Sequence, residues 1–158
     1  MTNAARKVLA DCETALRLLE DETDLDVWRV HWVGALTLIR AVGHILHKVD
    51  GKDGGIREFA ERSYQAWKAK DEHAIFRDFI ERERNNILKE YGFGYDPAEA
   101  FGVVAEEGSI HFLDENIYRP ITEGYGQGED TRDVYREAID WWRTQLDEID
   151  RERGLSLG

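Results

Sequence analysis

Four basic side chains recur on one side of the apolar segment 24–49. With successive residues placed about 100° apart on a helical wheel, one sector spanning about 60° holds Arg29, Arg40, His44 and His47. Guanidinium groups bind phosphates and carboxylates, and imidazoles exchange protons near neutral pH. Because the remaining circumference is apolar, this sector either faces solvent or lines a partly buried polar cleft.

Segment 72–91 supplies a candidate partner for these bases. Glu83 falls near the middle of the apolar face of that segment, with Arg84 on its flank. An ionised carboxylate on a core-facing stripe needs a cation or several hydrogen-bond donors, because burial otherwise favours its neutral form. We therefore expect Glu83 to pair with a base of segment 24–49, and Arg40 is the candidate. Such a pair serves either a site or the fold alone.

The spacing of His44, His47 and Asp50 offers a metal-binding alternative. These residues recur every three positions, as HxxHxxD, so they could present ligands along one face of a helix. No H-x-x-x-H or E-x-x-H pattern accompanies them, and the sequence also lacks phosphate-loop, nucleophile-elbow, C-x-x-C and dinucleotide patterns. We expect no cofactor from these patterns.

Cysteine and tryptophan residues have simpler explanations in packing. Cys12 lies on the apolar stripe of segment 3–20, so we expect it in the core rather than as a nucleophile. Trp141 and Trp142 point in different directions from their helix. We expect one of them in the core and the other at a partner chain, because tryptophan is favoured at interfaces.

Helices must position these side chains, and the apolar periodicity predicts five of them. Apolar residues recur at helical spacing over about 3–20, 24–49, 56–69, 72–91 and 131–153. The second segment is apolar almost all round, which is typical of the central helix of a bundle. Asp24 or Asp26 suits its start, and the glycine-rich stretch 50–55 ends it.

The stretch 92–128 has a different character. It holds seven of the 14 glycines and both prolines, and within it the β-favouring residues around Glu107-Gly108 predict a short hairpin over 101–112. We see no linker or repeat that would divide the chain. The sequence therefore predicts an all-α, single-domain bundle of about five helices with an irregular or β-hairpin insertion before the last helix.

Charge and apolar run lengths limit the classes of function. The 158 residues carry a net charge of -12, and an acidic surface repels phosphate backbones, which disfavours generic nucleic-acid binding. No run approaches the roughly 20 apolar residues that span a bilayer, so we expect no membrane insertion. The charges of the first segment argue against a signal peptide, and a single cysteine forms no internal disulfide. We therefore expect a cytoplasmic protein.

The sequence ERERNNILKEYGF at 81–93 resembles the end of a bundle helix in the HEPN superfamily of all-helical domains. Members typically carry an arginine, often followed by asparagine, and then a histidine a few residues later. They commonly dimerise so that two motifs share a cleft, and many are metal-independent ribonucleases. Arg84 and Asn85 match the opening of this motif. The positions where the histidine would lie hold Lys89, Glu90 and Tyr91.

The resemblance implies a non-catalytic or diverged binding or interaction module that forms a homodimer, because the residue expected to transfer protons is missing. Arg84 and Asn85 would then bind a phosphate or nucleotide, with His44 or His47 as substitutes for the missing histidine. A ribonuclease or phosphate-ester hydrolase using the same cleft is the enzymatic alternative, and a metal-binding bundle is the third. Besides a second copy of the chain, we consider a protein or a nucleotide as partner. The candidate ligand-binding residues are Arg40, His44, His47, Glu83, Arg84 and Asn85.

Overall fold

The computed structural model describes residues 1–95, 102–112, 116 and 118–155. The described residues contain five α-helices, namely α1 (Asn3–Asp21), α2 (Leu25–Lys48), α3 (Gly54–Ala69), α4 (Arg82–Glu90) and α5 (Thr131–Leu155). Shorter elements are the 3₁₀ turns η1 (Asp50–Lys52) and η2 (Asp71–His73), the π-helical segment η3 (Phe76–Glu81), and the strands β1 (Gly102–Val104) and β2 (Ile110–Phe112).

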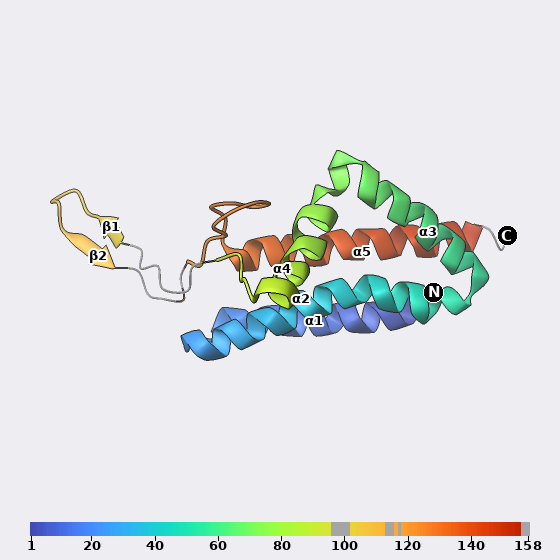
Figure 1. The fold of residues 1–158 in the computed structure, drawn as a ribbon, viewed down its shortest axis with the longest axis horizontal. Coiled ribbons are helices and arrows are strands. Elements are labelled where there is room, and N and C mark those ends of the chain that lie inside the picture. Colours follow the sequence, from blue (N-terminus) through green and yellow to red (C-terminus); the bar gives the residue numbers. More distant parts are fainter. Residues whose placement is uncertain (96–101, 113–115, 117, 156–158) are drawn as a thin grey trace.

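Three long helices form the body of the molecule. In Figure 1, α1, α2 and α5 run along the long axis, α3 crosses them obliquely, and the hairpin extends away from the helices at one end. Helix α1 packs against both α2 and α5, and α3 packs against α5. The predicted all-α bundle with a hairpin insertion before the last helix is confirmed.

Aspartate side chains begin three of these helices. The carboxylate of Asp24 accepts hydrogen bonds from the backbone N–H groups at the start of α2, and Asp53 does the same for α3. The first turn of α1 has a non-local cap, because Asp50 accepts hydrogen bonds from the N–H groups of Ala4 at 3.0 Å and Ala5 at 2.8 Å. These carboxylates satisfy donors that the first helical turn otherwise leaves unpaired.

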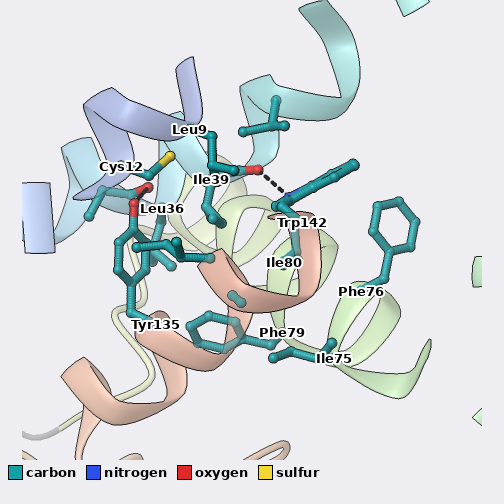
Figure 2. Close-up of a cluster of buried hydrophobic side chains, with 14 of the residues drawn as sticks. Leu9, Cys12, Leu36, Ile39, Ile75, Phe76, Phe79, Ile80, Tyr135 and Trp142 are labelled. Carbon is teal, nitrogen blue, oxygen red and sulfur yellow. Dashed lines mark hydrogen bonds between the residues drawn. The ribbon is translucent and has the colours of Figure 1, made fainter. Parts of the chain in front are cut away.

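The core lies where α1, α2, η3 and α5 meet (Figure 2). Two large α5 side chains are fully buried there, and each donates a hydrogen bond to a backbone carbonyl of α2. The indole nitrogen of Trp142 donates to Ile39 O at 2.9 Å, and the hydroxyl of Tyr135 donates to Ala35 O at 2.8 Å. Buried polar atoms need such partners, so these bonds fix how α5 lies on α2.

Cys12 and Trp141 are both accounted for by packing within the chain. Cys12 is fully buried beside Tyr135, which confirms the expectation of a core cysteine. Trp141 is partly buried, because its ring stacks on Phe76 with centroids 5.4 Å apart and its nitrogen donates to His73 Nδ1 at 3.2 Å. The indole of Trp141, which we expected to contact a partner chain, therefore contacts side chains of its own chain.

The predicted helix over 72–91 is present, but it is not α-helical throughout. The chain passes from the 3₁₀ turn η2 through two α-helical residues and the π-helical segment η3 to α4, so its hydrogen-bonding pattern changes along the segment. A π turn contains one more residue than an α turn, which rotates everything after it relative to a regular helix. Helix α4 then ends at Tyr91, which adopts the left-handed conformation at φ 53.

The residues that follow α4 return to the bundle before the hairpin begins. The indole nitrogen of Trp32 donates to Phe93 O at 3.0 Å, and Gly94 O accepts the backbone N–H of Thr122 at 2.9 Å. The predicted hairpin is present, with Val103 opposite His111 and Val104 opposite Ile110. Of the predicted irregular insertion 92–128, residues 96–101, 113–115 and 117 lie outside the described residues.

Candidate functional site

A pocket of about 270 Å³ opens between α2 and α3. Its floor is apolar and its rim is polar. The lining residues are Arg40, Gly43, His44, Leu46, His47, Ala60, Glu61, Tyr64, Gln65, Trp67 and Phe76. Three of the six predicted ligand-binding residues, Arg40, His44 and His47, therefore line one pocket, and both histidines are exposed.

Arg40 is the most buried of the basic groups in the pocket. Its Nη2 lies 3.4 Å from Glu81 Oε1, and Lys68 Nζ lies 3.2 Å from the other oxygen of the same carboxylate. The guanidinium carbon also lies 5.9 Å from the centre of the Phe76 ring. Arg40 is thus held in place by one shared carboxylate and one aromatic face.

His44 stands in a row of bases on α2. Arg40, His44 and Lys48 are spaced four residues apart, so they lie one above the other on the same helical face. Partial burial lowers the pKa of His44 first, and the positive charges of Arg40, Arg84 and Lys48 lower it further, while Glu81 opposes them. The imidazole is therefore neutral near pH 7, ready to accept a proton or a hydrogen bond.

His47 also lines the pocket and has an acidic neighbour. Its Nε2 lies 3.6 Å from Glu61 Oε1, and both side chains are about half exposed. The two histidines therefore have different neighbours: the charges acting on His44 are mainly positive, whereas His47 lies beside a carboxylate.

Arg84 and Asn85 lie beside the pocket on α4. Arg84 is partly buried, its Nη1 donates to Asn85 Oδ1 at 3.4 Å, and its charge acts on His44 across the α2–α4 contact. Arg29, the remaining base of the predicted sector, is eleven residues before Arg40, about 16 Å along α2. It pairs with Asp26 at 2.8 Å and takes no part in the pocket.

The expected pair between Glu83 and Arg40 is wrong. Glu83 is buried, as its place on the apolar face predicts, but its Oε2 has no hydrogen-bond partner among the described residues. The carboxylate lies against Gly94, where any side chain would overlap it. Burial raises the pKa of Glu83, Arg82 lowers it and Glu123 raises it. Glu83 therefore belongs to the packing under the loop at Gly94, away from the pocket.

The HxxHxxD spacing does not assemble a ligand set. Both oxygens of Asp50 accept hydrogen bonds from the start of α1, and His47 faces Glu61. Within the described part of the chain, no group of three or more histidine, cysteine or acidic side chains is placed to hold a metal ion.

The aromatic wall of the pocket was missed by sequence reasoning. Tyr64 and Trp67, three residues apart on α3, meet at an interplanar angle of 81°, and Phe76 packs against both rings. Trp67 is fixed by a 2.6 Å hydrogen bond from its indole nitrogen to Gln145 Oε1. The three-residue spacing is the signal that could have found this wall, because such residues share a helical face.

A second hollow, of about 530 Å³, lies at the start of α5 and is more open and more acidic. It is lined by Glu20, Tyr118, Gly128, Glu129, Asp130, Arg132, Asp133 and Arg136. Both arginines are already in ion pairs, Arg132 with Asp130 and Arg136 with Glu20 and Asp133. We therefore take the pocket between α2 and α3 as the candidate site.

In comparisons with known proteins, no family model, curated protein or solved structure matches the chain. In the described residues, every helix is too short or too polar to cross a membrane.

Proposed function

We propose that this chain is a non-catalytic, HEPN-like binding module that holds a phosphate-bearing ligand, such as a nucleotide, in the pocket between α2 and α3. One observation carries the proposal. Arg40 and His44 of α2 line the same pocket as the aromatic side chains of α3, and the positive charges of Lys48 and Arg84 act on His44 from outside its lining.

The chemistry of the pocket suits a ligand with two unlike parts. Guanidinium and ammonium groups bind phosphate oxygens, and Tyr64 offers an aromatic side chain for a planar ring at the same pocket. The volume of about 270 Å³ lies near the lower limit for small-molecule sites. A mononucleotide that leaves part of its sugar in solvent fits these dimensions.

Calorimetric titration with AMP tests this proposal. We expect saturable binding to the wild-type chain and a loss of about tenfold in affinity for His44→Ala. The matched control is His31→Ala, since His31 is a partly exposed histidine of the same helix beside Glu22, outside the pocket. Absence of AMP binding, or equal losses in both variants, would rule out the pocket as the site.

We further propose that the module is a cytoplasmic homodimer. Its free thiol is buried, which suits a reducing compartment, and the hairpin exposes the apolar side chains of Val103, Val104 and Ile110. A two-stranded hairpin is marginally stable alone in water, so contact with a second copy would stabilise it. Light scattering should give a dimer mass for the wild type and a monomer mass for Val104→Asp. A wild-type monomer contradicts this part of the proposal.

The neutral imidazole of His44 favours one enzymatic alternative, a ribonuclease or phosphate-ester hydrolase. A neutral histidine beside cations can act as a general base on a phosphate ester. Incubation of an excess of protein with mixed RNA and with p-nitrophenyl phosphate decides between the two. Turnover that disappears in His44→Ala supports the enzyme, and unchanged substrates support the non-catalytic module.

A further inference from the structure

We propose that Glu83 of α4 is a pH-dependent switch: its protonated form holds the loop 122–124 at Gly94, and its ionised form releases that loop. The inference goes beyond the proposed function, because neither Glu83 nor the loop lines the pocket between α2 and α3. It gives a regulatory role to a buried carboxyl group that the binding chemistry does not use.

The carboxyl group of Glu83 is enclosed without a partner. Glu83 is 5% exposed, and its Oε2 forms no hydrogen bond within the described part of the chain. That oxygen lies against Gly94, close enough to overlap any side chain placed there. A buried carboxyl group that lacks donors and a dedicated cation favours its neutral form, because ionisation would leave a charge that nothing solvates. The closed arrangement therefore keeps the proton on Glu83.

The charged groups around Glu83 do not compensate for its burial. Burial raises the pKa of Glu83, Arg82 lowers it, and Glu123 of the loop raises it further. Helix α2, which packs against α4, adds no charge that acts on Glu83. The side chain of Arg82 is 44% exposed, and its Nη2 lies 3.6 Å from Glu123 Oε1. The charge of Arg82 is thus shared with the loop and with solvent.

The contacts that attach the loop at this point are sensitive to the charge on Glu83. Gly94 O accepts hydrogen bonds from the backbone N–H of Thr122 at 2.9 Å and from its hydroxyl at 3.2 Å. Arg82 adds its ion pair with Glu123. An ionised Glu83 would compete for Arg82, repel Glu123 and need water where Gly94 now lies. Separation of the loop and Gly94 from α4 admits that water, so ionisation and release occur together.

The switch lies at the base of the insertion that carries the hairpin. Tyr95 forms an antiparallel bridge with Ile121, directly beside Gly94 and Thr122, and β1 and β2 lie between these positions in the chain. Release therefore loosens the attachment of the hairpin to the bundle. The attachment is complete below the ordinary glutamate pKa of about 4.3 and is lost as the pH rises through the raised native pKa of Glu83.

Amide hydrogen exchange of the wild type and of Glu83→Gln, followed by NMR between about pH 4 and about pH 8, tests the inference. Glutamine has the size of the protonated acid and does not ionise, so the variant should stay closed. The ratio of wild-type to variant exchange rates at the Thr122 amide removes the intrinsic effect of pH. It should be near one at the acid end and rise by up to about tenfold per pH unit until the native pKa is passed. Glu90→Gln, which alters an exposed acid of α4, should match the wild type.

Urea distinguishes local release from global unfolding. Exchange at Thr122 should change little in dilute urea, because release exposes little surface, whereas exchange at Ile39 in the core should accelerate. A ratio at Thr122 that stays constant with pH overturns the inference. Equal urea dependence at Thr122 and Ile39 also overturns it, since the loop would then open only with the whole fold. Neither result bears on the pocket, which the AMP titration tests separately.

Discussion

The Nη2 atom of Arg40 lies 3.4 Å from Oε1 of Glu81. The Phe76 ring also faces this guanidinium, although Phe76 precedes Glu81 by five residues. Residues five apart are about 140° apart around an α-helix, so a regular helix would not direct both toward one side chain. The π-helical segment closes a turn over five residues and brings the two together. The π-helical segment therefore places the acid Glu81 beside Arg40.

Replacing that acid should lower stability and strengthen anion binding. Glu81→Gln removes two ion pairs from a carboxylate that is 16% exposed, and we expect a loss of about 1 kcal/mol in the free energy of unfolding. Affinity for AMP should rise, because the surroundings of Arg40 in the pocket gain net positive charge. Glu72→Gln is the control, since Glu72 is 66% exposed and its loss should change stability by less than about 0.5 kcal/mol. Equal effects of the two variants would contradict this assignment.

The buried carboxyl of Glu83 should make stability depend on pH. Its native pKa is raised by burial, so the folded state holds the proton over a pH range in which the unfolded state has released it. Stability therefore falls as pH rises from the ordinary glutamate pKa, about 4.3, through the raised native value. Each tenfold difference in proton affinity between the folded and unfolded states corresponds to about 1.4 kcal/mol of unfolding free energy.

Glu83→Gln tests this dependence, because glutamine has the size of the protonated acid and does not ionise. Urea unfolding should show a gain for the variant near neutral pH that shrinks as the pH approaches 4.3. Glu58→Gln on the exposed surface of α3 should show no such trend. A gain that is constant with pH would mean that folding does not shift the pKa of Glu83.

Gly94 should tolerate no side chain. Its φ is +68, and an added Cβ would overlap Oε2 of Glu83. We expect Gly94→Ala to cost about 2 kcal/mol of unfolding free energy, from the left-handed backbone and the overlap together. In a Glu83→Ala background the overlap disappears, so the cost should fall to about 1 kcal/mol. Gly54→Ala, which meets no atom within 4 Å, should change stability little.

The helices could be predicted from the sequence because apolar periodicity is a local signal. The same wheel placed Glu83 on the buried face, and it is 5% exposed. That Arg40 pairs with Glu81 rather than with Glu83 could not be predicted, because a wheel with one fixed angle per residue ignores the π-helical segment. Neither glycine nor proline marks that turn in segment 72–91.

Contacts between segments that are far apart in the chain could not be predicted from the sequence either. Asp50 looked like a metal ligand because it continues the histidine spacing, yet it caps α1 across 45 or more residues of chain. The candidate site was found in part, because Arg40, His44 and His47 share one helical face. Its aromatic wall comes from α3 and η3. The spacing of Tyr64 and Trp67 places both on one face of α3, but the packing of α3 and η3 against α2 is what brings that face to the pocket.

Cys12 should react with thiol reagents only after unfolding. The side chain is fully buried, and burial raises the pKa of its thiol to about 12. Both effects suppress the thiolate that such reagents attack. Ellman's reagent should therefore label the native protein at least about a hundredfold more slowly than protein in concentrated urea. Rapid labelling of the native chain would place the thiol at the surface.

Gln145 should matter for the wall of the pocket as well as for stability. Its Oε1 accepts the indole N–H of Trp67 at 2.6 Å, and both side chains are buried. Gln145→Leu leaves that donor unpaired, so we expect a loss of about 1 to 3 kcal/mol and weaker AMP binding. Trp67→Phe removes the donor instead of the acceptor. Because both single variants break the same hydrogen bond, the sum of their separate losses should exceed the loss in the double variant. Thr144→Val is the control and should alter neither property, because Thr144, the residue before Gln145 on α5, is exposed. Additive losses in the double variant would show that the hydrogen bond contributes nothing beyond packing.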